Sequence, residues 1–128
     1  MDTLLAGRSI LVVEDEMLVL LNVEDMLADL GCTAVSAAAN ADQALALIAA
    51  QSFDAAMVDV NLDGRKSYPV ADALAARGVP FVFSTGYSGE SLDYGYRDRP
   101  MLGKPYREVD LVEALTQLLL PAQRRSGT

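Results

Sequence analysis

The sequence predicts an α/β domain in which helices cover both faces of a parallel β-sheet. Short apolar runs alternate with longer stretches of helical period, and this pair of patterns occurs five times. Most of the short runs are continuously apolar, which is typical of strands buried on both sides. With 128 residues and a 52% hydrophobic composition, the chain suits one domain with a core at about residues 8–120 and a frayed tail at 121–128.

Four of the five expected strands end beside a polar or charged side chain that can take part in chemistry. Glu14 and Asp15 follow the first strand, Asp59 follows the third, and Thr85 and Lys104 follow the last two. Because parallel strands place their carboxyl ends along one edge of a sheet, we expect these side chains to converge in one crevice. The strands are expected at residues 9–13, 33–36, 55–58, 81–84 and 100–102.

Helical spacing and end signals place helices between and after these strands. The first spans about residues 16–30 and ends before Gly31, a common residue just past a helix end. The second starts after Asn40, a good N-cap, and reaches about residue 50. The third carries apolar residues at helical spacing and ends before Gly78, and the last spans about residues 107–120.

The charge of the chain argues against several classes of partner. Ten lysine and arginine residues against eighteen aspartate and glutamate residues give a formal net charge of −8, which disfavours binding to nucleic acid or to an anionic membrane surface. No apolar run is long enough to span a membrane, and the N-terminus does not resemble a signal peptide. Cys32, the only cysteine, is expected in the core, which suits a reducing compartment, so we expect a cytoplasmic protein.

The converging acidic residues require a cation. Carboxylates at neighbouring strand ends repel each other, and Mg²⁺ prefers one or two carboxylates together with water and phosphate oxygens. Asp15 and Asp59 fit that description, and a carboxylate beside such a metal can attack phosphorus to give an aspartyl phosphate. Lys104 and the Thr85 hydroxyl would then contact phosphoryl oxygens. Each of these residue types alone is also common in turns and at helix starts, so the prediction depends on the order in which they occur along the chain, each at its own strand end.

These residues resemble the receiver domain of two-component response regulators, and the resemblance covers almost the whole chain, from about Arg8 to Leu120. It implies a flavodoxin-like (βα)5 three-layer sandwich with strand order 2-1-3-4-5, acting as a single receiver with no output domain. The matching motifs are Glu14-Asp15-Glu16 for the acidic loop, Met57-Val58-Asp59 for the phosphoacceptor strand, Ser84-Thr85-Gly86 for the hydroxyl switch and Lys104-Pro105 for the lysine.

The resemblance also implies a role for each residue of the pocket. Asp59 accepts a phosphoryl group from a sensor histidine kinase or a histidine phosphotransfer protein. Asp15 and Asp59 bind Mg²⁺, with Mn²⁺ as an alternative, together with the backbone carbonyl of Asn61, while Glu14 holds a metal-bound water. Asn61 and Tyr87 occupy the positions that tune how fast the aspartyl phosphate forms and hydrolyses.

One departure from the family concerns the switch. Receivers usually carry an aromatic residue three positions before the lysine, where this chain has Met101. The stretch 80–87 together with Met101 is similar to a subgroup of receivers named for a Phe-Ala-Thr-Gly-Tyr-type motif. Three glycines interrupt the polar stretch 85–99, so the fourth helix is expected to be short or irregular. We therefore expect Thr85, Gly86 and Met101 to form a switch in which this stretch orders around the phosphoryl group.

The first helix predicts a partner surface. Residues 17–21 are all apolar, and a helix with 3.6 residues per turn cannot bury five consecutive side chains, so Leu18 is expected to be exposed. In the family this face docks the kinase or phosphotransfer partner, so we expect Leu18 and Val19 to contact that partner. A downstream protein target is also expected. The alternative is a surface with scattered apolar residues and no function.

Two other functions are compatible with these residues. One is a Mg²⁺-dependent phosphohydrolase with Asp59 as nucleophile, but such enzymes usually carry a general-acid aspartate two residues later, where this chain has Asn61. The other is a receiver-shaped interaction module that acts without phosphorylation, which the intact set of Asp15, Asp59, Thr85 and Lys104 disfavours. We therefore expect a phosphoacceptor that catalyses only its own phosphorylation and dephosphorylation, and not an enzyme.

Overall fold

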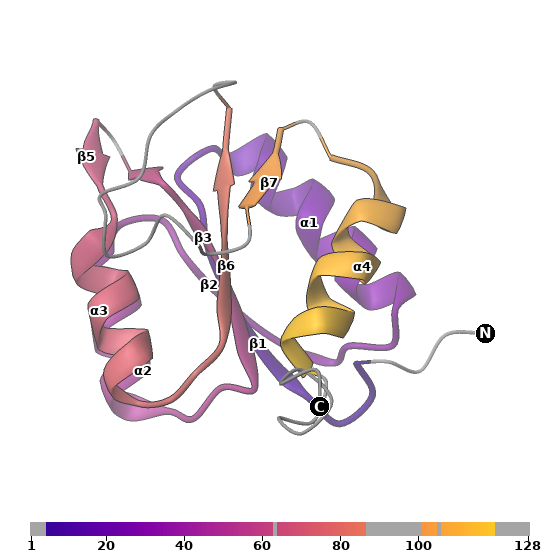
Figure 1. Ribbon diagram of the computed structural model, residues 1–128, viewed down its shortest axis with the longest axis horizontal. Coiled ribbons are helices and arrows are strands. Elements are labelled where there is room, and N and C mark those ends of the chain that lie inside the picture. The colour runs from indigo at the N-terminus through magenta and orange to yellow at the C-terminus, as the bar shows by residue number, and fades with distance from the viewer. Residues whose placement is uncertain (1–4, 63, 87–100, 105, 120–128) are drawn as a thin grey trace, which may run out of the picture.

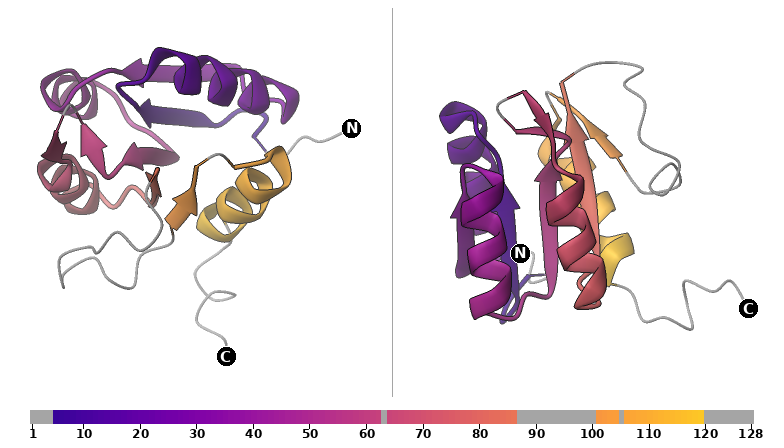
Figure 2. Two further views of the ribbon diagram at one scale, coloured as in Figure 1. Left: turned by 90° about the horizontal axis from the view of Figure 1, so that it is seen from above. Right: turned by 90° about the vertical axis from the view of Figure 1, so that its left-hand side faces the viewer.

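The chain forms three layers, with a β-sheet between two pairs of helices (Figures 1 and 2). The computed structural model describes residues 5–62, 64–86, 101–104 and 106–119. One face of the sheet is covered by α1 (Met17–Asp29) and α4 (Glu108–Leu119), and the other by α2 (Ala41–Ala50) and α3 (Tyr68–Ala76). The predicted α/β sandwich is therefore confirmed.

The central sheet has five parallel strands in the spatial order β2-β1-β3-β6-β7, which confirms the predicted 2-1-3-4-5 topology. β2 lies on one side of β1, and the later strands β3, β6 and β7 lie on the other. The order therefore reverses between β1 and β3, which is where ligands bind in open α/β sheets. The strands are β1 (Ser9–Val13), β2 (Ala34–Ala38), β3 (Ala55–Asp59), β6 (Phe81–Thr85) and β7 (Met101–Gly103).

The strands divide their side chains between two apolar cores, because successive side chains of a strand point to opposite faces. In β1, Ile10 and Val12 pack on the α1 and α4 side, and Leu11 and Val13 pack on the α2 and α3 side. Cys32 is 6% exposed and lies in the α1 and α4 core, as predicted. Both faces of the sheet are thus buried, which accounts for the continuous apolar runs in the sequence.

The element boundaries differ little from the prediction. Asn40 caps α2 as expected, since its side-chain oxygen accepts a hydrogen bond from the N–H of Gln43 at 2.8 Å. β2 extends to Ala38, two residues further than expected, because β1 provides a pairing partner as far as Val13. The fourth helix was expected within residues 85–99 and the tail at residues 121–128. Apart from Thr85 and Gly86, these stretches lie outside the described residues.

A short antiparallel hairpin follows β3, in a stretch where the sequence predicted no strand. Its strands are β4 (Asn61–Leu62) and β5 (Arg65–Lys66). Gly64 in the turn has φ +83°, a conformation that glycine adopts without steric cost. The hairpin begins two residues after Asp59 and therefore fixes one wall of the crevice at the end of β3.

Candidate functional site

Residues from neighbouring strands meet at the carboxyl edge of the sheet. β3 ends at Asp59, and its neighbour β6 ends at Thr85. Hydrogen bonds between neighbouring strands also continue one residue beyond β1 and β7. The N–H of Glu14 donates to the carbonyl of Ala38 at 2.9 Å, and the N–H of Lys104 donates to the carbonyl of Thr85 at 2.7 Å. The main chain thus places Glu14, Asp59, Thr85 and Lys104 along the carboxyl edge of the sheet, where ligands bind in open α/β folds.

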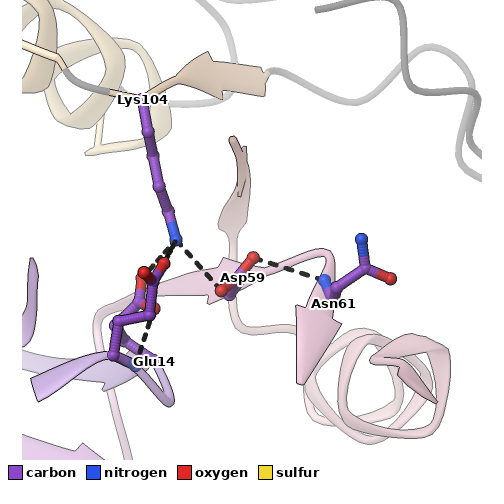
Figure 3. Close-up of polar contacts among 5 residues, drawn as sticks. Glu14, Asp59, Asn61 and Lys104 are labelled. Carbon is purple, nitrogen blue, oxygen red and sulfur yellow. Dashed lines mark hydrogen bonds and ion pairs between the residues drawn. The ribbon is translucent and has the colours of Figure 1, made fainter. Parts of the chain in front are cut away.

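The ammonium of Lys104 contacts three carboxylates (Figure 3). It lies 2.8 Å from Glu14, 3.0 Å from Asp59 and 3.3 Å from Glu16. Glu14 and Asp59 are only 3% and 5% exposed, so these charge-assisted contacts offset the cost of burying them. Main-chain donors add to this support. The N–H of Glu16 donates to Glu14 at 3.1 Å, and the N–H of Asn61 donates to Asp59 at 3.3 Å.

Burial changes the protonation equilibria of this cluster. Desolvation raises the pKa of Asp59 to about 7, although the hydrogen bond from Lys104 lowers it, and the charge of Glu14 raises it further. For Lys104, burial lowers the pKa, but hydrogen bonds to Glu14 and Asp59 outweigh burial and hold that pKa above its ordinary value. The lysine is therefore a permanent cation, while Asp59 needs a further positive charge nearby to stay ionised at neutral pH.

The acidic residues have the chemistry of a magnesium site. Oxygens of Glu14, Asp15 and Asp59 lie within 4.8 Å of one another, and Asp15 is exposed to solvent. Mg²⁺ prefers hard oxygen ligands of this kind and retains several waters, so a partly solvated acidic triad fits it. Asp15 and Asp59 of the triad line an open pocket of about 560 Å³, which Asn61 and Gly86 also line.

The residues predicted to form the switch lie on β6 and β7. Thr85 is 6% exposed at the end of β6. Among the residues that the structure describes, no atom lies within 4 Å of a Cβ added at Gly86, so none of them crowds the main chain there. Met101 is half-buried, pairs with Phe83 and packs against the α2 and α3 core. Tyr87 lies outside the described residues.

The exposed apolar residues of α1 lie beside a second pocket. Leu18 is 82% exposed, which confirms the expectation from the sequence, and Met17 and Leu21 are 62% and 50% exposed. Val19 is half-buried and packs against the α1 and α4 core. The second pocket, of about 530 Å³, is lined on one side by Leu18 and Val19 and on the other by Tyr106.

Two residues of the site were not singled out from the sequence. Glu16 directly follows the acidic pair and was assigned to the acidic loop and to the start of a helix without a role of its own, but its carboxylate contacts Lys104. Tyr106 lies two residues after Lys104 and lines the second pocket. Burial and the charge of Glu14 raise the pKa of Tyr106 to about 12, so its hydroxyl stays neutral. Proximity to a predicted site residue was the only sequence signal for either.

Comparison with models of protein families shows the family of the chain. A model of the response regulator receiver domain matches residues 10–116. The chain belongs to the response regulator receiver family. No match was found among curated proteins.

Several solved receiver structures resemble the chain. The solution structure of SdrG from Sphingomonas melonis Fr1 shares 47% sequence identity with a TM-score of 0.79, covering 88% of this chain and 97% of SdrG. The BeF3-activated conformation of SdrG from Pseudomonas melonis Fr1 is also 47% identical, with a TM-score of 0.78 and coverage of 90% and 98%. The receiver domain of sensor histidine kinase PA1611 from Pseudomonas aeruginosa PAO1, solved with a magnesium ion in its active site cleft, is 27% identical, with a TM-score of 0.75 and coverage of 89% and 98%.

As a receiver, the protein signals through phosphorylation and is a phosphoacceptor, not an enzyme that turns over a substrate. Receiver domains are phosphorylated by histidine kinases, and the acidic triad is typical of their magnesium site. Among the residues that the structure describes, no helix combines the length and the apolar character needed to cross a membrane.

Proposed function

We propose that Asp59 accepts the phosphoryl group in this receiver. The observation that carries the proposal is the position of its carboxylate at the end of β3, where it lines the acidic pocket, is 3.0 Å from the Lys104 ammonium and forms part of the acidic triad. In the transfer, an oxygen of Asp59 bonds to phosphorus as the bond between phosphorus and the donor's histidine nitrogen breaks. The phosphoryl group thus passes from one side chain to another without net hydrolysis.

Asp15 and Asp59 would hold Mg²⁺, or Mn²⁺ as an alternative, together with the backbone carbonyl of Asn61. Glu14 would act through a metal-bound water, which agrees with its deeper burial and its contact with Lys104. When bound, the ion neutralises charge on the phosphoryl oxygens and on the carboxylates. Asn61 also donates its main-chain N–H to Asp59, so it orients the acceptor carboxylate from the hairpin side.

Lys104 and Thr85 would stabilise the phosphorylated state. The lysine donates to one phosphoryl oxygen, and the Thr85 hydroxyl donates to another. Because the N–H of Lys104 is bonded to the carbonyl of Thr85, movement at the end of β6 is coupled to the lysine. We assign the rate-tuning positions to Asn61 and Tyr87.

The switch would follow the Phe-Ala-Thr-Gly-Tyr-type subgroup of receivers. Met101 stands where most receivers have an aromatic side chain, and it is packed in the α2 and α3 core. Thr85 and Gly86, which no other described residue crowds, would then provide the movement, since glycine permits a wide range of main-chain angles. The segment expected to order around the phosphoryl group, at residues 87–99, lies outside the described residues.

The partner surface would be the apolar side of α1. A sensor histidine kinase or a phosphotransfer protein would contact the exposed Leu18 and the half-buried Val19 beside the second pocket. This pocket adjoins the acidic one, so a donor histidine carried by a partner docked there is close to Asp59. Exposed apolar side chains next to a reactive pocket are typical of a docking surface.

The test is intact-mass spectrometry after incubation with Mg²⁺ and acetyl phosphate. We expect a labile gain of one phosphoryl group in the wild-type protein and in Asp54→Asn, and no gain in Asp59→Asn. Asp54 is a matched control because it lies at the other end of β3, where it accepts a hydrogen bond from the Ser9 N–H at 2.7 Å. Phosphate release from many substrates without a stable adduct would instead support the phosphohydrolase. If the protein forms no adduct and releases no phosphate, the result would support the interaction module that acts without phosphorylation.

A further inference from the structure

Carboxylates occupy all three N–H donors of the Lys104 ammonium. An ammonium carries three N–H donors, and in this structure it contacts the three carboxylates of Glu14, Asp59 and Glu16 at 2.8, 3.0 and 3.3 Å. A phosphoryl group on Asp59 needs one of these donors. One of the existing contacts must therefore lengthen or break when the phosphoryl group arrives.

Exposure decides which carboxylate is released most easily. Asp59 carries the phosphoryl group, so Lys104 has to stay beside it. The side chain of Glu14 is only 3% exposed, so Glu14 would be left as a buried charge without its cation if Lys104 moved away. The side chain of Glu16 is 64% exposed and makes the longest of the three contacts. Water can solvate the Glu16 carboxylate after release, so breaking its contact with Lys104 costs less free energy than breaking either of the other two.

The side chain of Glu16 also has open space into which it can move. Together with Gly86 and Lys104, it lines both the acidic pocket and the pocket beside α1, so it stands on the wall that the two share. Glu16 is the N-cap residue of α1, but its side chain makes no capping hydrogen bond there. A neutral replacement therefore removes the charge that attracts Lys104 without the loss of a capping hydrogen bond.

We propose that Glu16 is a positioning residue that competes with the phosphoryl group for Lys104. Its carboxylate holds the ammonium among the acidic residues before phosphorylation and gives it up when a phosphoryl oxygen takes its place. This inference rests on the proposed role of Asp59. It predicts that Glu16 weakens the binding of a phosphoryl mimic while its negative charge favours the binding of Mg²⁺.

The test compares four full-length proteins by fluorine NMR titration with beryllofluoride in excess Mg²⁺. Removing an exposed ion-pair competitor should raise the apparent beryllofluoride affinity of Glu16→Gln about threefold. Glu16→Asp retains the charge but is one methylene shorter, so it should show most of the same gain. Asp25→Asn removes one charge from an exposed position of the same helix and should match the wild type. Mg²⁺ affinity without beryllofluoride, measured by calorimetry, should fall or stay equal in Glu16→Gln.

The outcomes separate a direct contact from a general effect of charge. If Glu16→Gln shows the gain but Glu16→Asp behaves like the wild type, charge repulsion explains the result and the proposal is wrong. Equal affinities in all four proteins, or stronger binding of both Mg²⁺ and beryllofluoride in Glu16→Gln, would also overturn it. A wild-type protein that forms no beryllofluoride adduct would refute the proposed role of Asp59 itself, which no variant of Glu16 can do.

Discussion

Replacing Asp59 with asparagine should stabilise the metal-free protein at alkaline pH. Asp59 is 5% exposed, and its pKa is about 7 in the folded protein against 3.8 for the unperturbed group. The folded protein therefore retains a proton that the unfolded chain releases. The free energy of unfolding falls as the pH rises from about 4 to about 7, and it levels off above the folded pKa. Asparagine has no such proton, so the variant escapes this loss.

The size of the effect follows from the same two values. The rise from 3.8 to about 7 is about three pKa units, which corresponds to about 4 kcal/mol for a fully buried group. The pocket is open to water, which screens part of this cost, so we expect Asp59→Asn to gain about 2 kcal/mol at pH 8. For a domain of this length, that gain raises the melting temperature by about 6 °C. At pH 4 the two proteins should melt within about 1 °C of each other.

The assay is thermal unfolding followed by circular dichroism between pH 4 and pH 9 with a chelator present. Asp25→Asn is the control, because it removes an exposed charge from α1 and should change the melting temperature little at any pH. Adding Mg²⁺ at pH 8 should stabilise the wild type and have a much smaller effect on Asp59→Asn. A gain in Asp59→Asn that is the same at pH 4 and pH 8, or no gain at all, would refute the argument from burial.

Three further predictions concern the fold and the partner surface. Asn40→Ala removes the side-chain oxygen that accepts from the Gln43 N–H and should lower the free energy of unfolding by about 1 kcal/mol in urea titrations. Asn40→Ser keeps a capping oxygen and should retain most of that stability. Leu74→Ala opens a cavity in the α2 and α3 core at a fully buried position and should cost about 3 kcal/mol in the same assay. Leu18→Ala should change stability by less than about 0.5 kcal/mol but slow phosphotransfer from the cognate kinase about fivefold, with labelling by acetyl phosphate unchanged. An unchanged rate of kinase transfer would remove α1 as the docking surface.

The fold was predictable because its signals are local and repeated. Continuous apolar runs indicate strands buried on both faces, and Asn40 and Gly31 mark helix ends without reference to the rest of the chain. The end of β2 was predicted two residues too early, because the alanines there are weak strand formers and only pairing with β1 extends the strand. The hairpin after Asp59 was missed because each of its strands is only two residues long, too short for a periodic pattern.

The sequence by itself determined the layered α/β class and which residues stand at the ends of the strands, since both follow from apolar period and position along the chain. Only the tertiary structure decided which groups share the Lys104 ammonium. Glu16 and Lys104 are 88 residues apart, and no local pattern records their contact. Likewise, the raised pKa of Asp59 comes mainly from the burial of its carboxylate. Burial, and the distances between charges from distant segments, exist only once the chain has folded.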